Sequence, residues 1–410
     1  MEGTVRIGGS KNAVLPIMAA SLLAPGHYRI ENVPNLRDVT TMARLLEGMG
    51  VRVLFLKNRL DIDSSGCSKL EAPYDLVKTM RASVYVLGPL LARFGHAKVS
   101  LPGGCAWGPR PVNLHIEGMK KLGARIAIER GYIVARGDRL RGARIVFGIS
   151  SVGATGNVLL AAVLAEGLTV IENAAREPEI AALARFLNTM GAGIRGIGTE
   201  RLEVEGVETL HPADGTVIPD RIEAGTFLTA CALAGGDVTL SEVNPDHLSD
   251  VLEKLRKAGA AIEESGSGIR IRSDGRIHAV DAATAVYPGF PTDMQAQWMA
   301  LMSVAEGSST IVDTVYLDRF THVPELRRLG ADITLNRNAA EVKGVTHLSG
   351  APVMSTDLRA SASLIIAGLV AMGRTDISRV YHIDRGYEQI ENKLQALGAS
   401  IWREKEELVV

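Results

Sequence analysis

Residues 180–192, Ile-Ala-Ala-Leu-Ala-Arg-Phe-Leu-Asn-Thr-Met-Gly-Ala, carry an apolar stripe that ends at a glycine. Ile180, Leu183 and Met190 recur at the helical period, so the segment predicts an amphipathic helix. Gly191 follows the last apolar position, where glycine commonly takes the left-handed conformation that ends a helix. The segment therefore predicts a helix that packs one face on a core and ends just before Gly191.

The same pattern, an apolar residue followed by glycine and a small apolar residue, occurs six times in the 410-residue chain. The intervals between these glycines are 73, 68, 68, 71 and 68 residues, which indicates an internal repeat. A run of β-type residues follows each glycine. The six positions are Gly50, Gly123, Gly191, Gly259, Gly330 and Gly398.

A second glycine series lies 23 to 28 residues upstream of the first, and each of its members opens a short alternating strand. Each also follows a helix that is apolar on all sides, which is typical of a buried helix. The repeat therefore contains a buried helix, a strand, an amphipathic helix and two further strands. Six repeats are too many for one core, so we expect two domains of three, with the turn-rich residues 212–219 as a linker. The second series is Gly26, Gly95, Gly167, Gly236, Gly307 and Gly373, and the predicted buried helices are residues 13–24, 82–94, 155–165, 225–234, 294–305 and 360–372.

The composition limits the classes of partner. Lys and Arg total 45 and Asp and Glu total 46, so a net charge of −1 gives no case for nucleic-acid or membrane-surface binding. Cys67, Cys105 and Cys231 have no paired or metal-like spacing, which predicts a reducing compartment, no disulfide and no metal site. The longest apolar runs, such as residues 363–372, are far shorter than the roughly 18 residues that a membrane span needs.

Charged residues stand at the starts of the predicted buried helices. Helix N-termini carry unpaired N–H groups and partial positive charge, so they bind anions. Lys11 and Arg81 occupy equivalent starts, where a cation opposes the helix dipole and a bound phosphate or carboxylate would neutralise it. Either residue alone is more often a solvated side chain. Asp220 and Asp357, at two other starts, have an ordinary explanation as helix caps.

Residues 101–115, Leu-Pro-Gly-Gly-Cys-Ala-Trp-Gly-Pro-Arg-Pro-Val-Asn-Leu-His, predict a loop because their glycines and prolines break regular structure. The segment places the Cys105 thiol five residues before Arg110. Taken alone, it fits both a connector with an incidental cysteine and a functional loop that carries a reactive thiol.

These motifs together resemble the UDP-N-acetylglucosamine 1-carboxyvinyltransferases, a family of enolpyruvyl transferases, nearly from end to end. The resemblance implies an α/β fold of two inside-out domains, each with three βαβαββ repeats. Residues 11–218 would form the first domain, and residues 1–10 with 219–410 the second. The matching motifs are Gly-Gly-Ser-Lys-Asn at 8–12, Arg-Ala-Ser at 81–83, Leu-Pro-Gly-Gly-Cys-x-x-Gly-x-Arg-Pro-Val at 101–112, Ser-Val-Gly-Ala-Thr at 151–155, Tyr-Pro-Gly-Phe-Pro-Thr-Asp at 287–293, Thr-Asp-Leu-Arg-Ala-Ser-Ala-Ser at 356–363 and His-Ile-Asp-Arg-Gly-Tyr-Glu at 382–388.

The resemblance implies transfer of the enolpyruvyl group of phosphoenolpyruvate to the 3′-hydroxyl of UDP-N-acetylglucosamine, with release of phosphate. This is the first committed step of peptidoglycan synthesis, and it is blocked by fosfomycin. We expect a cytoplasmic monomer that uses no cofactor and no metal. Lys11, Arg110 and Arg385 look like ligands of phosphoenolpyruvate, and Cys105 looks like the general acid on a lid that closes over the site.

Asp293 looks like the general base, with Asn12 beside it at the sugar hydroxyl. Arg319, Asp357 and Arg359 look like further residues of the same cleft. The other expected substrate contacts are Arg81, Arg110, Pro111, Val112, Asn113, Leu114, Ser151, Val152, Gly153 and Val315.

Three other functions remain open. The sister enzymes that act on shikimate 3-phosphate lack the cysteine lid, so Cys105 argues against that acceptor. Asn113 stands where the family commonly has aspartate, and the chain begins later than most members do; together these two departures leave room for another nucleotide acceptor. Ile149 stands where some members have lysine, so we expect a different arrangement of diphosphate binding. A non-catalytic sugar-nucleotide sensor would be expected to have lost Asp293, Cys105 or Lys11, and the chain retains all three.

Overall fold

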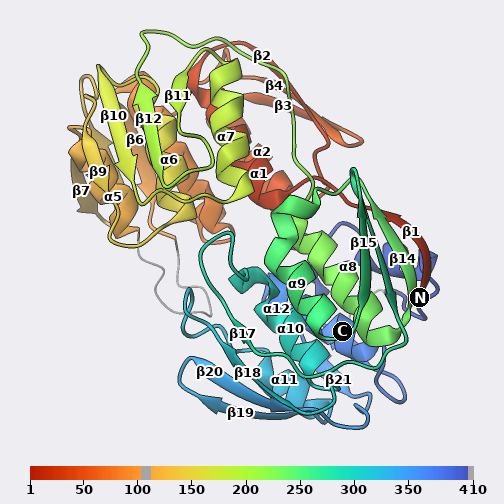
Figure 1. The fold of residues 1–410 in the computed structure, drawn as a ribbon. Coiled ribbons are helices and arrows are strands. Elements are labelled where there is room, and N and C mark those ends of the chain that lie inside the picture. The colour runs from red at the N-terminus through yellow and green to blue at the C-terminus, as the bar shows by residue number, and fades with distance from the viewer. Residues whose placement is uncertain (103–111, 405–410) are drawn as a thin grey trace. The chain divides into compact units, whose positions relative to one another are not determined.

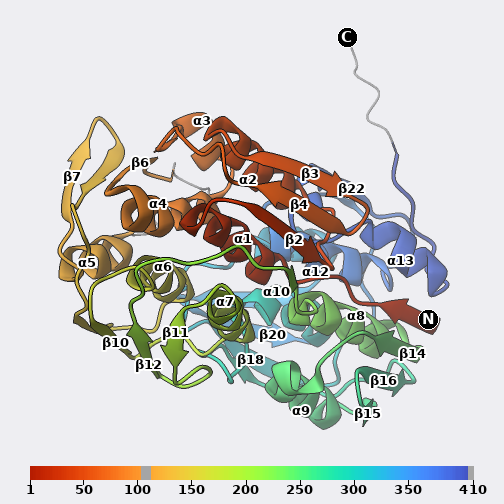
Figure 2. The ribbon, with the colours of Figure 1, turned by 90° about the horizontal axis from the view of Figure 1, so that it is seen from above.

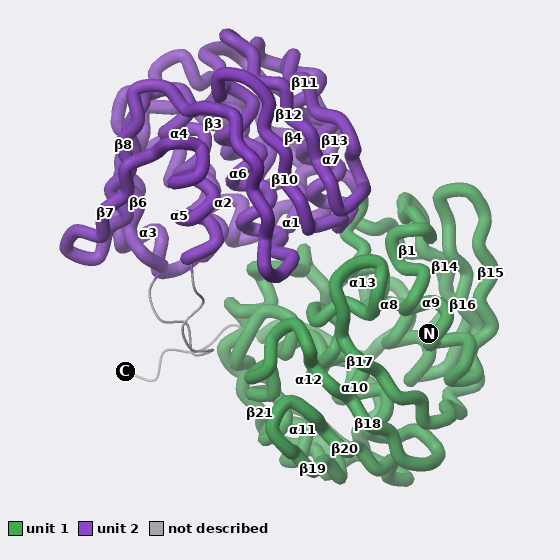
Figure 3. The backbone as a smooth tube through the Cα atoms, turned by 60° about the vertical axis from the view of Figure 1, so that its left-hand side comes forward, with its two compact units in different colours: residues 1–8, 219–410 green, residues 9–218 purple. Residues whose placement is uncertain are grey.

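The computed structural model describes residues 1–102 and 112–404. The chain divides into two compact units, shown in purple and green in Figure 3. Residues Gly9–Ile218 form the first, here called the continuous unit. Residues Met1–Gly8 and Pro219–Val410 form the second, the discontinuous unit. Each unit has its own hydrophobic core.

The continuous unit contains three repeats. The elements of the first are α1 (Lys11–Ala20), the 3-10 helix η1 (Ser21–Leu23), β2 (His27–Glu31), α2 (Arg37–Gly48), β3 (Arg52–Leu56), β4 (Arg59–Asp63) and β13 (Gly215–Thr216). Those of the second are β5 (Glu71–Ala72), α3 (Tyr74–Val77), the 3-10 helix η2 (Arg81–Val86), α4 (Leu87–Phe94), β6 (His96–Ser100), α5 (Asn113–Lys121), β7 (Arg125–Glu129) and β8 (Tyr132–Arg136). Those of the third are β9 (Arg144–Val146), α6 (Val152–Ala162), β10 (Leu168–Glu172), α7 (Pro178–Thr189), β11 (Gly193–Arg195) and β12 (Arg201–Glu205).

The discontinuous unit repeats the same order. Its first repeat comprises β1 (Glu2–Arg6), α8 (Arg221–Ala234), β14 (Gly236–Ser241), the 3-10 helix η3 (Pro245–Leu248), α9 (Ser249–Lys257), β15 (Ala261–Ser265) and β16 (Gly268–Ser273). Its second comprises β17 (Ala282–Ala283), the 3-10 helix η4 (Thr292–Met294), α10 (Gln295–Met302), β18 (Ser308–Val312), α11 (Val323–Arg328), β19 (Asp332–Asn336) and β20 (Ala339–Lys343). Its third comprises β21 (Pro352–Met354), α12 (Leu358–Gly368), β22 (Asp376–Ser378), the 3-10 helix η5 (Val380–Arg385) and α13 (Ile390–Ala396).

One pairing pattern recurs in five four-stranded sheets. In the sheet ordered β5-β6-β8-β7, the edge strand β5 runs parallel to β6, and β6, β8 and β7 pair antiparallel. Among the described residues the sixth repeat forms the parallel pair β21–β22. The predicted α/β fold of βαβαββ repeats is thus confirmed. The other four sheets have the orders β13-β2-β4-β3, β11-β12-β10-β9, β1-β14-β16-β15 and β17-β18-β20-β19.

Helices occupy the interior of each unit and sheets lie outside them. In Figure 2, α1, α4 and α6 lie between the strands of the continuous unit. In the discontinuous unit α8, α10 and α12 pack together (Figure 1). Every residue of α10 is buried, whereas α9 buries only one side. The distinction between buried and amphipathic helices, predicted from hydrophobic pattern, is therefore confirmed for this pair.

The repeat glycines end their helices as predicted. Gly50 follows the C-cap residue Met49, has a φ of +95°, and donates its N–H to the carbonyl of Glu47. A side chain there would also collide with the carbonyl oxygen of Gly66, because a Cβ would lie 2.4 Å from it. The other five glycines of the series also have positive φ, between +89° and +108°.

The bounds of several predicted elements differ from those in the structure. Helix α5 begins at Asn113, so the last three residues of the predicted loop 101–115 are helical. The predicted helix 82–94 is a 3-10 helix followed by an α-helix, since apolar pattern alone does not distinguish the two. The predicted linker 212–219 contains the division between the two units, after Ile218, but it also contains strand β13, whose backbone pairs with β2.

Each unit completes its first sheet with a strand from a distant part of the chain. Strand β1 pairs in parallel with β14, with Glu2 opposite Asp237. Strand β13 pairs in parallel with β2, with Gly215 opposite Ile30. Within residues 1–102 and 112–404, no helix is both long and apolar enough to cross a membrane.

Candidate active site

The predicted site residues fall into two groups, one in each unit. In the continuous unit they lie at helix starts. Lys11 and Asn12 begin α1, Arg81 begins η2, and Asn113 and Leu114 begin α5. Ser151 caps α6, Val152 and Gly153 are its first residues, and Val112 is the N-cap of α5. Cys105, Arg110 and Pro111 lie outside the described residues.

The cation at the start of α1 has a protein partner. Lys11 Nζ lies 3.5 Å from Asp38 Oδ2, and both side chains are largely buried. Asp38 is in the first turn of α2, where an acidic residue has an ordinary explanation in the helix dipole. The sequence alone therefore did not single out Asp38 as a site residue. The pair places a desolvated ammonium group at a helix N-terminus, a suitable environment for an anionic ligand.

A buried amide in α6 connects this helix to three other helical elements. Asn157 in α6 accepts a hydrogen bond from the Gly88 N–H through Oδ1 (2.8 Å). Its Nδ2 donates to the Val84 carbonyl (2.8 Å) and to His115 Nδ1 (3.0 Å). Since Gly88 can only donate, the amide orientation is fixed, and His115 must accept at Nδ1 and carry its proton on Nε2. Elements η2, α4, α5 and α6 are thereby tied together beside Arg81.

The His115 imidazole is neutral and lies against the start of α6. Burial, with a further contribution from the positive charge of Arg81, lowers the pKa of His115 to about 3. A Cβ on Gly153 would lie 3.1 Å from His115 Nε2, so glycine permits the close approach of α5 to α6. The Tyr85 hydroxyl donates to the Val152 carbonyl at 3.5 Å. The structure therefore brings Arg81, the start of α5 and the Ser151–Gly153 segment together.

The group in the discontinuous unit is centred on Asp293, in η4. Arg319 Nη1 donates to Asp293 Oδ1 at 2.7 Å, and Arg359 Nε lies 3.5 Å from Oδ2. Arg359 Nη2 also lies 3.8 Å from Asp220 Oδ2, and its side chain is only 1% exposed. Its guanidinium lies 5.1 Å from the centre of the Tyr387 ring. The Asp293 carboxylate therefore lies between two guanidinium groups, with Arg319 at Oδ1 and Arg359 at Oδ2.

Both arginines remain charged despite their burial. Burial acts to lower the pKa of Arg359, but Tyr387, Asp220 and Asp293 outweigh it, and the pKa is raised. Burial likewise opposes the charge of Arg319, and the neighbouring carboxylates, Asp293 first, raise its pKa. The site therefore combines fixed positive charge with one carboxylate that is 26% exposed, a composition suited to anionic substrates and proton transfer.

Both acidic helix caps are confirmed. Asp220 accepts from the N–H groups of Ile222 (2.8 Å) and Glu223 (3.0 Å) at the start of α8. Asp357 accepts from the N–H groups of Arg359 and Ala360 at the start of α12. Capping accounts for their positions, and Asp220 adds a charge partner for Arg359 that the sequence did not reveal. Arg385 ends η5, which packs against α12, and Val315 is half-exposed in the turn after β18.

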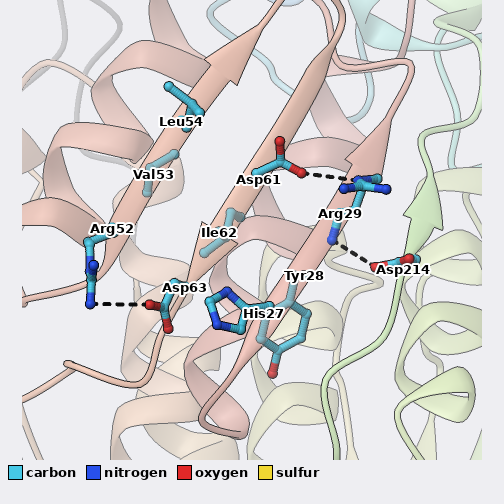
Figure 4. Close-up of a pocket in the computed structure, with 10 residues that line it drawn as sticks. All are labelled: His27, Tyr28, Arg29, Arg52, Val53, Leu54, Asp61, Ile62, Asp63 and Asp214. Carbon is cyan, nitrogen blue, oxygen red and sulfur yellow. Dashed lines mark hydrogen bonds and ion pairs between the residues drawn. The ribbon is translucent and has the colours of Figure 1, made fainter.

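An open hollow of about 540 Å³ lies elsewhere, on strands β2, β3 and β4 (Figure 4). None of the predicted site residues that the structure describes lines it. Its charges are paired across the strands: Arg29 Nε contacts Asp61 at 3.2 Å, and Arg52 contacts Asp63 at 3.6 Å. Asp214 accepts the backbone N–H of Arg29 at 2.9 Å. Because its charged side chains pair with one another, we do not propose this hollow as the active site.

His322, a buried histidine beside the Asp293 group, makes the stability of the discontinuous unit depend on pH in the acid range. Burial lowers the pKa of His322 from 6.5 to about 4, with Arg319 adding to the shift and Asp357 opposing it. Its ring stacks on Phe320, with centroids 6.4 Å apart. The unfolded chain therefore binds a proton below pH 6.5 that the folded unit accepts only near pH 4. Stability is present at pH 7 and is lost as the pH falls through this window.

Replacing His322 with leucine is expected to remove this sensitivity. Between pH 7 and pH 5 the native protein should lose about 2 kcal/mol more unfolding free energy than His322→Leu. Urea unfolding can be followed by the fluorescence of Trp298, which is fully buried in the same unit. Equal pH dependence in the two proteins would show that His322 is not neutral in the folded state.

Comparison with known proteins identifies the class. The family model for EPSP synthase (3-phosphoshikimate 1-carboxyvinyltransferase) matches residues 1–394, and the chain belongs to this family of enolpyruvyl transferases. UDP-N-acetylglucosamine 1-carboxyvinyltransferases match it along nearly its whole length. The enzyme of Chlorobaculum parvum is 57% identical, covering 99% of this chain and 96% of the relative. That of Chloroherpeton thalassium is 58% identical (98% and 95%), and that of Myxococcus xanthus 55% identical (99% and 97%).

Solved structures have the same fold. The enolpyruvyl transferase NikO from Streptomyces tendae aligns with a TM-score of 0.87 at 26% identity, covering 97% of this chain and 95% of that one. EPSP synthase from Acinetobacter baumannii aligns with a TM-score of 0.73 at 19% identity, covering 98% and 97%. The second comparison supports the fold alone. The family resemblance drawn from the sequence motifs is thereby confirmed.

Proposed function

We propose that this protein transfers the enolpyruvyl group of phosphoenolpyruvate to the 3′-hydroxyl of UDP-N-acetylglucosamine in peptidoglycan synthesis. Relatives 55–58% identical over the whole chain carry that name. The observation in the structure that best supports the chemistry is the Asp293 carboxylate held between Arg319 and Arg359. The protein would act as a cytoplasmic monomer, without a metal or organic cofactor.

The proposed reaction proceeds by addition and elimination. The sugar hydroxyl oxygen bonds to C2 of phosphoenolpyruvate while its proton passes to Asp293, and Cys105 delivers a proton to C3. The C2–O bond to phosphate then breaks, C3 returns a proton to the Cys105 thiolate, the proton on Asp293 passes to the departing phosphate, and the enol ether and inorganic phosphate are released. A hydroxyl is a weak nucleophile, so a positioned carboxylate contributes by removing its proton.

The cations would bind the substrates. Lys11, Arg110 and Arg385 would hold the phosphate and carboxylate of phosphoenolpyruvate, since ammonium and guanidinium groups form strong charge-assisted hydrogen bonds with such anions. Asn12 would contact the sugar hydroxyl. Arg81 and the helix starts would hold the nucleotide, whose diphosphate suits the N–H groups of a first helical turn. The other proposed contacts are Pro111, Val112, Asn113, Leu114, Ser151, Val152, Gly153, Val315, Asp357 and Arg359.

An acceptor panel tests this function directly. Purified protein is given phosphoenolpyruvate with UDP-N-acetylglucosamine, other UDP-sugars, UMP or shikimate 3-phosphate, and released phosphate is measured. We expect release only with UDP-N-acetylglucosamine, together with a product heavier by one enolpyruvyl group in place of a hydrogen. Release with shikimate 3-phosphate or another nucleotide alone would reassign the acceptor. Nucleotide binding without any phosphate release would favour a sensor.

A further inference from the structure

A buried carboxylate outside the proposed contact residues organises the Asp293 region. Asp313 follows β18 and is completely buried. Its Oδ1 accepts from the Thr284 hydroxyl (2.7 Å) and from the backbone N–H groups of Val315 (3.0 Å) and Tyr316 (2.8 Å). Its Oδ2 accepts from the Thr292 hydroxyl at 2.7 Å. One side chain therefore joins the segment after β17, the turn after β18 and the start of η4.

The Thr292 hydroxyl extends this network to the site. It accepts from Arg319 Nη1 at 3.2 Å, and the same nitrogen donates to Asp293 Oδ1 at 2.7 Å. Thr292 also directly precedes Asp293 in the chain. An ionised carboxylate can only accept, so the Thr292 proton points to Asp313 and its lone pair faces Arg319. The direction of every hydrogen bond from Asp313 to Asp293 is thus determined.

We propose that Asp313 is a positioning residue for the transfer reaction, acting through Thr292 and Arg319 on the Asp293 carboxylate. The proposal rests on the proposed role of Asp293 as general base. Asp313 also fixes the turn that carries Val315, a proposed substrate contact. A base must lie within hydrogen-bond reach of the proton that it removes, so a displacement of about 1 Å can lower the rate by up to about 100-fold.

Thr292→Val removes only the hydroxyl link and keeps the other three hydrogen bonds of Asp313. We expect kcat to fall at least about tenfold, while KM for both substrates changes by less than about twofold. Thr292→Ser restores the hydroxyl and should return kcat to near the native value. Native kcat in Thr292→Val, or a Thr292→Ser variant as slow as the valine variant, would overturn the proposal.

Asp313→Asn tests the direction of the hydrogen bonds between Asp313 and Thr292. Its Oδ1 must still face the N–H groups of Val315 and Tyr316, so its NH₂ group would face Thr292, and the Thr292 hydroxyl proton would lose its acceptor. We expect kcat to fall as in Thr292→Val, with a similar melting temperature. The matched control is Asp237→Asn in β14, where Asp237 forms an exposed ion pair with Arg270 in β16; this variant should keep native kcat. Native kcat in Asp313→Asn would contradict the proposal.

A crystal structure of Thr292→Val tests the positioning role of Asp313 independently of the proposed function. We expect Arg319 Nη1 to move beyond hydrogen-bond distance, about 3.5 Å, of Asp293 Oδ1. If the native protein releases no phosphate with any acceptor, the proposed function fails, and this distance alone decides the positioning role. An unchanged Arg319–Asp293 contact would overturn it.

Discussion

Asp293→Asn is expected to lower kcat by about 100-fold or more, with little change in the affinity for the sugar nucleotide. The amide keeps the shape of the carboxylate, but it cannot take the proton of the attacking hydroxyl. Arg319 and Arg359 keep their positive charge in the variant, so we expect substrate binding to change little. Single-turnover phosphate release measures the chemical step, and calorimetric titration of UDP-N-acetylglucosamine measures binding.

The control for Asp293→Asn must separate chemistry from folding. Asp293 offsets part of the charge of the buried Arg359, so the melting temperature of the variant has to be measured as well. Arg359 keeps Asp220 as a partner, 3.8 Å away, and we therefore expect the variant to fold. Lost nucleotide binding with intact turnover would instead make Asp293 a positioning residue.

Cys105→Asp is expected to retain measurable activity, whereas Cys105→Ala and Cys105→Ser should be at least about 100-fold slower. The addition step needs an acid that protonates the methylene carbon. A thiol with a pKa of about 8.5 is mostly protonated at neutral pH, and a carboxyl group with a pKa of about 4 can serve only at lower pH. The aspartate variant should therefore show an acid-shifted optimum in a pH–rate profile.

Alkylation provides an independent test of the same residue. A thiolate is nucleophilic, so fosfomycin, a small phosphonate epoxide, should inactivate the native protein and add its mass to Cys105. The aspartate variant should resist it. If Cys105→Asp is as inactive as Cys105→Ala, the assignment as acid is wrong, and an obligatory covalent adduct becomes the better account.

The repeats could be predicted because their signals are local. A glycine at the C′ position and an apolar stripe each depend on a few neighbouring residues, and Gly50 and Gly191 adopt the expected positive φ. The 3-10 starts of two buried helices could not be predicted in this way. Arg81 and Asp293 both lie in such segments, where the apolar pattern resembles that of an ordinary helix.

The supporting residues of the site were missed because their partners are distant in the chain. His115 and Asn157 are separated by 42 residues, and Thr292 and Asp313 by 21. A buried carboxylate such as Asp313 has no periodic or motif-like signal in one sequence. The residues at helix starts could be predicted from the sequence, because every helix N-terminus carries a partial positive charge that favours anions.

The distant partner of strand β1 has a consequence for synthesis on the ribosome. Residues 2–6 leave the ribosome well before their partner β14, which begins 234 residues later, at Gly236. At about 5–20 residues per second, the nascent β1 segment waits on the order of tens of seconds for its sheet. The continuous unit, Gly9–Ile218, is complete before then and contains all of its own strands. Vectorial synthesis therefore favours folding of this unit first, while the residues that precede it still lack a partner.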